Sequence, residues 1–196
     1  MAGNQRFPLH DPGASARGTF LARPAQPPIF TATSDWPAEG SDNRNGHQEN
    51  LLPELTLQIA QAIVATALSR ARELNLKPLA IVVLDDRGAV KAAAAEDATS
   101  LRRYEVAHGK TYGALALGLG SRSIGKRARE QPSFVAAVSH IAGGALVPVA
   151  GGVLLKSRDG ILLGAVGASG DTSDNDERVV LAGIEAAGLI GDPGAD

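Results

Sequence analysis

Residues 56–76 alternate between apolar and polar positions with the period of a helix. Apolar side chains recur at spacings of three and four, at Ile59, Ala60, Ile63, Val64, Ala67, Leu68, Ala71 and Leu74. This spacing places them on one face of an amphipathic helix. Thr56 stands directly before the pattern and is the residue type that caps a helix N-terminus. The pattern therefore predicts a helix that begins after Thr56.

Two β-hairpins are predicted from apolar runs that are separated by turn residues. In the first, residues 79–84 and 89–95 flank the sequence DDRG; in the second, residues 151–157 and 161–169 flank RDG. Gly and Asp between apolar runs favour tight turns. We also expect residues 143–149 to form a short edge strand, because Pro148 cannot donate to a central ladder.

Three further helical regions follow from the same reading. Residues 100–120 form a long helix with Ser100 as a candidate cap, and residues 173–188 form the last helix. Two short helices lie between them, one capped by Ser121 and one with Pro132 in its first turn. The resulting order of elements is typical of an antiparallel α/β sandwich and lacks the βαβ alternation of a Rossmann fold.

Gly109 and Gly113 lie inside the long helix, four residues apart and therefore on one face. A glycine costs about 1 kcal/mol at an interior helical position. The close approach of another backbone or of a ligand would offset this cost.

Residues 1–53 differ in composition from the rest. They contain seven of the eleven prolines and show no sustained period. Such a segment is too polar to bury its own core, so we expect an extended arm ahead of a domain at residues 54–196. Two interpretations remain open: a disordered tail, or an arm that places Ile29, Phe30 and Trp36 on its own or a neighbouring subunit.

Composition excludes several classes of protein. The net charge is −2 and there is no run of Lys or Arg, which argues against nucleic-acid binding. The chain has no Cys, so disulfides and thiolate metal sites are excluded. No apolar run is long enough to span a membrane, and the first twenty residues lack the apolar core of a secretory signal. We therefore expect a cytoplasmic protein. Aromatic residues are few, so Ala, Val, Leu and Gly must fill the core in thin, closely packed layers.

The acidic sequence GASGDTSDNDE, residues 167–177, is best explained as a helix start. Ser173 followed three residues later by Asp176 resembles a capping box, and acids in a first turn complement the helix dipole. A calcium loop starting at Asp171 or Asp174 lacks the required glycine. No metal site is predicted here. Gly170, Asp171 and Thr172 precede the predicted cap and remain candidates for ligand contact.

Polar residues of the long helix and of the next one are the other candidates. Glu105 and His108 share a face, but a single Glu-x-x-His does not make a di-iron site. Lys110, if desolvated beside the glycines, has the chemistry of a base or an anion clamp. Arg122 is placed to reach a carboxylate.

Several of these segments together resemble the GlcG/HbpS family, which includes the C-terminal domain of PduO proteins. The resembling segments are GKTYGALALGLGSR, GGALVPVAGGVLL and GAVGASGDTSDNDERVVLAGIEAAGL, and the likeness covers about residues 55–189. It implies a profilin-like α/β/α sandwich with a five-stranded antiparallel sheet, a homo-oligomer that is often an octamer, and a link to haem binding or degradation.

The resemblance also bears on iron ligation. In the haem-binding type a threonine of the long helix is associated with the iron, and the matching position here is Gly113. His108 and Tyr112 are the candidate replacements. The family's surface iron motif has a formal match in Asp174 and Glu177, which helix capping also explains.

Two functions follow as hypotheses. The first is an oligomeric binder of haem or another tetrapyrrole. The second is a cofactor-free isomerase, hydrolase or lyase acting on a small organic acid or carbonyl compound, with Lys110, Asp171 and His108 as catalytic residues. Either ligand would be contacted by Glu105, Gly109, Tyr112, Gly113, Arg122, Gly170 and Thr172. A structural oligomer without chemistry is the third possibility.

Overall fold

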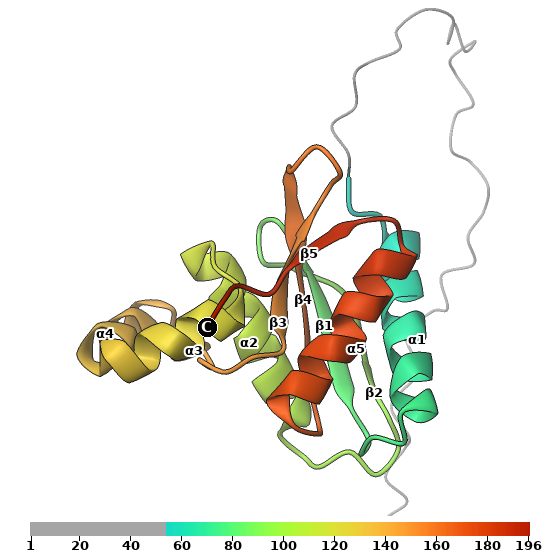
Figure 1. Ribbon diagram of the computed structural model, residues 1–196, viewed down its shortest axis with the longest axis horizontal. Helices are drawn as coiled ribbons and strands as arrows, with labels where there is room; N and C mark the ends of the chain where they lie inside the picture. The colour runs from blue at the N-terminus through green and yellow to red at the C-terminus, as the bar shows by residue number, and fades with distance from the viewer. Residues whose placement is uncertain (1–53) are drawn as a thin grey trace, which may run out of the picture. The chain divides into compact units, whose positions relative to one another are not determined.

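A computed structural model describes residues 54–196 of the chain (Figure 1). The predicted extended arm and its apolar residues lie outside the described residues. The elements in chain order are α1 (Leu57–Glu73), β1 (Ala80–Asp85), β2 (Val90–Ala95), α2 (Arg103–Leu117), α3 (Ser121–Glu130), α4 (Pro132–Ile141), β3 (Gly152–Lys156), β4 (Leu162–Ser169), α5 (Ser173–Ala186) and β5 (Ile190–Asp192).

The five strands form one antiparallel sheet in the order β2-β1-β4-β3-β5. Both predicted hairpins are confirmed, and β1 pairs with β4 to join them at the centre of the sheet. The predicted edge strand at residues 143–149 is wrong. The edge beside β3 is instead formed by β5, while the backbone N–H of Val147 donates to the carbonyl oxygen of Gly109 in α2, 3.1 Å away.

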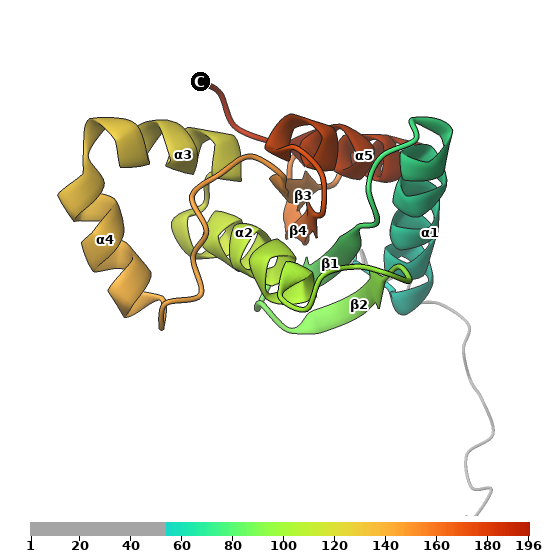
Figure 2. The same ribbon diagram turned by 90° about the horizontal axis from the view of Figure 1, so that it is seen from below.

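Helices cover both faces of the sheet, as the α/β/α sandwich requires (Figure 2). On β1, Ile81 and Val83 pack with α1 and α5, whereas Ala80, Val82 and Leu84 pack toward α2. The period-2 alternation of a strand thus divides one apolar run between two separate layers. The larger core lies between the sheet and the helix pair α1 and α5.

Glycine and alanine allow α2 to lie very close to the sheet. A Cβ atom at Gly167 in β4 would meet the side-chain hydroxyl of Thr111 and the carbonyl oxygen of Ala107, and one at Gly152 in β3 would meet the backbone of Lys110. The prediction of thin, closely packed layers is therefore confirmed.

The helix starts agree with the sequence in part. Thr56 caps α1, since its hydroxyl accepts a hydrogen bond from the N–H of Ile59 at 3.2 Å, and Pro132 is the first residue of α4. Ser100 does not cap α2, which begins at Arg103 without a side-chain cap. Ser121 is the first residue of α3, whose N-cap is Gly120, and its hydroxyl accepts from the N–H of Gly152 instead.

The start of α5 also differs from the prediction. The N-cap is Thr172, whose backbone is extended and whose hydroxyl accepts from the N–H of Asn175 at 3.3 Å. The predicted capping box of Ser173 and Asp176 is therefore wrong by one residue. Asp176 is therefore not the capping acid of α5.

Helices α3 and α4 extend from one end of the sandwich (Figure 2). Only Val135 of α4 is buried, although the helix is largely apolar. Among residues 54–196, no helix is both long and apolar enough to cross a membrane.

Candidate functional site

A cavity of about 400 Å³ lies between α2 and the segment that follows α4. One wall is formed by Tyr104, Glu105, His108 and Gly109 of α2, and the other by Gly143, Gly144, Ala145 and Val147. The volume falls in the range of small-molecule sites, about 300–1,000 Å³. Three of the candidate site residues, Glu105, His108 and Gly109, therefore line one cavity.

Three rings stand in a row along α2, and two of them, Tyr104 and His108, line this cavity. Tyr104, His108 and Tyr112 are each four residues apart, the spacing that aligns side chains on a helix. The imidazole of His108 lies 5.8 Å from the ring of Tyr112, with only 10° between the planes, and 6.1 Å from the ring of Tyr104. Tyr112 in turn packs over Gly88 in the turn between β1 and β2. The histidine ring is thus held between two tyrosines.

The two helix glycines are explained by close packing. A Cβ atom at Gly109 would lie 2.7 Å from a methyl group of Val147, and one at Gly113 would lie 3.0 Å from Cγ of Leu146. Gly109 borders the cavity, whereas Gly113 is covered by Leu146. By contrast, a Cβ atom at Gly143 or Gly144 would have no atom within 4 Å, so the opposite wall is open backbone.

Lys110 does not face this cavity. Its ammonium group and the carboxylate of Asp176 in α5 are 2.8 Å apart, and each side chain is only 2% exposed. Gly151, with a φ of +112°, lies against this pair, so a side chain there would collide with both partners. Lys110 is therefore buried, and Asp176 holds it in an ion pair.

Asp171 ties the start of α5 to the loop before β1. Its carboxylate accepts hydrogen bonds from the side-chain amide of Asn175 and from the N–H groups of Thr172 and Lys77. These bonds, the one from Asn175 first, lower the pKa of Asp171 to about 2. Its own N–H donates to Oδ1 of Asp176 at 3.1 Å. Gly170 packs against Pro78 and Leu79, so this turn is filled by protein.

Arg122 contacts carboxylates of the protein itself. Its guanidinium contacts Oε1 of Glu177 at 2.9 Å, Asp174 at 2.6 Å and Asp196 at 2.9 Å. The hydrogen bonds to Glu177, then to Asp174, raise the pKa of Arg122. The second carboxylate oxygen of Glu177 is buried without a partner in the described part of the chain. Asp174 and Glu177 are thus occupied by an arginine.

The predicted catalytic residues are not assembled in one pocket. Lys110 is paired with Asp176, Asp171 is engaged by its own loop, and His108 lines the α2 cavity. Glu105 in that cavity pairs with Arg102 at 2.6 Å, and this hydrogen bond lowers the pKa of Glu105. Within residues 54–196, no group of three or more His, Asp or Glu side chains is placed to hold a metal ion.

The roles of three residues, Tyr104, Asp176 and Glu177, were not predicted from the sequence. Tyr104 completes the row of rings, and its four-residue spacing from His108 was a usable signal. Asp176 and Glu177 were interpreted as capping acids. Their partners, Lys110 and Arg122, are 66 and 55 residues away in the chain, and no local pattern reveals such pairs.

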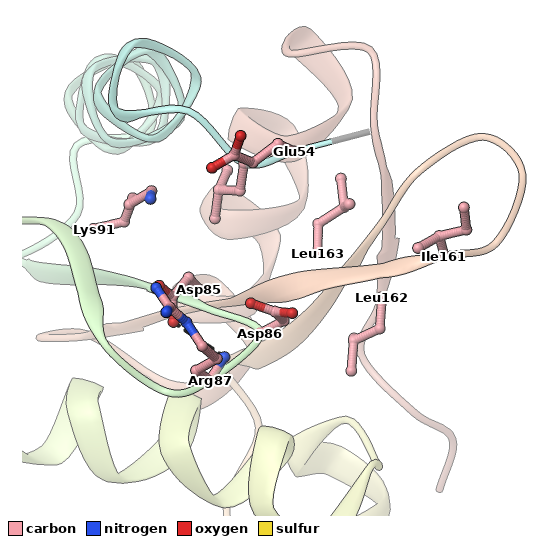
Figure 3. A pocket seen from close by; sticks show the side chains of 9 residues that line it. Glu54, Asp85, Asp86, Arg87, Lys91, Ile161, Leu162 and Leu163 are labelled. Carbon is pink, nitrogen blue, oxygen red and sulfur yellow. Dashed lines mark hydrogen bonds and ion pairs between the residues drawn. The ribbon is translucent and has the colours of Figure 1, made fainter. Parts of the chain in front are cut away.

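A second cavity of about 360 Å³ lies between the tips of the two hairpins (Figure 3). Glu54, Asp85, Asp86, Arg87 and Lys91 give it a charged wall. Asp85 is buried, but its carboxylate accepts from the N–H groups of Ala89 and Arg87 and from the Arg87 guanidinium. Its hydrogen bonds are therefore satisfied within the turn, and we favour the α2 cavity as the ligand site.

Comparison with known proteins gives a consistent fold. Residues 55–185 match the family model described as haem degrading protein HbpS-like. A structure of PduOC in complex with haem is 24% identical, with a TM-score of 0.63, over 70% of this chain and 98% of that chain. A double mutant of Streptomyces reticuli HbpS is 21% identical, with a TM-score of 0.60, over 76% and 98% of the two chains. Klebsiella pneumoniae ORFY is 20% identical, with a TM-score of 0.63, over 73% and 97%. No curated protein matches.

Proposed function

Because the chain belongs to the HbpS-like family, we propose that it binds a haem or a related tetrapyrrole in the cavity between α2 and residues 143–147. The observation that carries the proposal is the row of rings on the α2 wall, with His108 held between Tyr104 and Tyr112. The structure of PduOC with haem, which shares this fold, supports the choice of ligand.

The residues of the cavity suit a flat, mostly apolar ligand. Aromatic side chains offer large rigid faces, and the open backbone of Gly143 and Gly144 leaves room opposite them. A bound haem would contribute an iron that accepts a protein ligand. The protein would contribute the shape of the cavity, the imidazole of His108, and a charged rim at Glu105 and Arg102.

The position that matches the iron-associated threonine is not available for this role. Gly113 has no side chain, and Leu146 covers it. A ligand in this chain would therefore be contacted one turn earlier on α2, around His108 and Gly109.

The proposal extends to a homo-oligomer. Two large apolar side chains are strongly exposed: Leu101, 86% exposed just before α2, and Ile141, 84% exposed at the end of α4. In the sequence, each lies two or three residues before a segment that forms one wall of the cavity. Apolar side chains so exposed favour coverage by another protein surface. A second copy of the chain is the proposed partner. Light scattering should then give an oligomeric mass for the wild type and a lower mass for the double variant Leu101→Asp/Ile141→Asp.

Titration of haem into the purified full chain tests the proposed function. We expect a shift of the Soret band that saturates at a fixed ratio of haem to protein. An unshifted band at micromolar haem would reject haem as the ligand. No observation in the structure favours the cofactor-free enzyme, since its proposed residues lie in separate environments.

A further inference from the structure

We infer that His108 supplies a protein ligand to the iron of the bound haem, an inference that rests on the proposed function. A side chain that binds the iron needs a donor atom with a free lone pair, and it must reach the cavity. His is a common choice for haem, with Cys, Met and Tyr as the others.

The composition of the chain narrows the choice of ligand. There is no Cys, and the one Met is Met1, outside the described residues. Between residues 54 and 196 the histidines are His108 and His140. His140 is exposed on α4 and does not line the cavity, whereas His108 is half-buried in its wall. His108 is thus the imidazole that this cavity offers.

The environment of His108 suits a metal ligand. No hydrogen bond to either ring nitrogen is made within the part of the chain that the structure describes, so neither lone pair nor N–H is already engaged there. The two tyrosines limit rotation of the ring, since Tyr112 stacks on it at 10° and Tyr104 flanks it. A ligand whose orientation is fixed before binding loses less entropy when the bond forms.

The other basic side chain on this part of α2 cannot compete for the iron. Lys110 is turned away from the cavity and is held at 2.8 Å by Asp176. Tyr104 and Tyr112 share the face of His108, but a phenol must give up its proton to bind iron, whereas the neutral imidazole has a nitrogen lone pair that binds a metal directly.

Two porphyrins separate ligation from binding. Haem and iron-free protoporphyrin IX are titrated into the full-length wild type and into the variants His108→Ala and His140→Ala. Iron-free porphyrin fills the cavity but forms no bond to His108. We expect His108→Ala to lower the affinity for haem at least about tenfold, because loss of even an outer-sphere partner lowers metal affinity 10–100-fold. Its affinity for iron-free porphyrin should fall by a clearly smaller factor, because that porphyrin loses only its contact with the ring and no bond to a metal.

Spectra of the haem complexes give the second readout. The wild type and His140→Ala should show the same nitrogen-ligated absorption and electron paramagnetic resonance signals. His108→Ala should lose them, and added imidazole should restore them.

The outcomes distinguish the two claims. If wild type shows no Soret shift, the proposed function fails and this inference fails with it. If wild type binds haem but His108→Ala keeps the wild-type spectrum, the inference alone is wrong. Equal loss of both porphyrins in His108→Ala also contradicts it, because His108 would then act only as part of the wall.

Discussion

The ammonium group of Lys110 on α2 lies 2.8 Å from Oδ2 of Asp176 on α5, although these two helices cover opposite faces of the sheet (Figure 2). The pair meets beside Gly151, just before β3 begins, where the absence of a side chain leaves space for both groups. A single buried ion pair therefore joins the two helical layers. It also explains how a lysine is accommodated on a closely packed helix.

Lys110→Met should destabilise the protein by roughly 3–5 kcal/mol, because it leaves the carboxylate of Asp176 buried without its partner. Urea unfolding at a fixed protein concentration measures the loss. The double variant Lys110→Met/Asp176→Asn should recover part of it, since no charge then remains buried. A loss below about 1 kcal/mol for Lys110→Met would mean that water reaches this pair.

Gly167→Ala and Gly113→Ala make the same chemical change in two different environments. At Gly167 the new methyl group meets the hydroxyl of Thr111 and the carbonyl of Ala107, which are held by the helix, so we expect a loss of about 1–3 kcal/mol or more. At Gly113 it meets Cγ of Leu146 at 3.0 Å, which is tight but less severe, while the gain in helix propensity is about 1 kcal/mol. Gly113→Ala should therefore remain within about 1 kcal/mol of the wild type. Thermal and urea unfolding compare the two, and equal losses would contradict the close approach of α2 to β4.

The carboxylate of Asp171 should make stability depend on pH in the acid range. Its pKa falls from 3.8 to about 2 in the folded chain, chiefly through the hydrogen bond from Asn175. A lowered pKa contributes stability that is present above pH 3.8 and is lost as the pH falls through about 2.

The wild type should therefore exceed Asp171→Asn in stability at pH 6, and the difference should close between pH 4 and pH 2. Urea unfolding across this range measures it. Asp159→Asn, in the exposed turn before β4, is the matched control, because Asp159 makes no side-chain hydrogen bond or ion pair among residues 54–196. A difference for Asp171→Asn that does not change with pH would contradict the role of the charge.

Arg122→Met should be markedly more destabilising than Arg129→Met. Arg122 neutralises Glu177, whose side chain is 8% exposed and whose second oxygen has no partner in the described residues, so its loss should cost about 2 kcal/mol or more. Among residues 54–196, Arg129 pairs only with the exposed Asp196, at 3.5 Å, and such pairs contribute about 0–1 kcal/mol. Urea unfolding of both variants tests the difference. Similar losses would show that Glu177 is adequately solvated.

Local patterns predicted most of the fold. The helical period after Thr56 and the turn residues of both hairpins predicted α1 and four strands, because these signals depend on near neighbours in the chain. Residues 143–149 have the apolar composition of an edge strand, yet they pack on Gly109 and Gly113 instead. The competing surface is on α2, more than thirty residues earlier, so no local rule reveals it.

The candidate site could be predicted only in part. Glu105, His108 and Gly109 were identified because helical spacing places the ligand-type residues near glycines. The role of Asp176 was missed because the N-cap of α5 is Thr172 and not Ser173, and this one-residue offset decides whether Asp176 is the capping acid or faces the core. That offset is set by the extended backbone of Thr172, which sequence does not specify. The ion pair of Lys110 with Asp176 depends on how α2 and α5 meet beside Gly151, which is a tertiary contact that no local pattern reveals.

Haem titration of two tryptophan variants tests the location of the ligand site most directly. Ala145→Trp places a large ring inside the cavity between α2 and residues 143–147, whereas Ala136→Trp places the same ring in the separate apolar cavity of about 290 Å³ against α4. We predict that Ala145→Trp abolishes the saturable Soret shift and that Ala136→Trp binds haem like the wild type. Saturable binding of wild-type affinity by Ala145→Trp would contradict the proposed site.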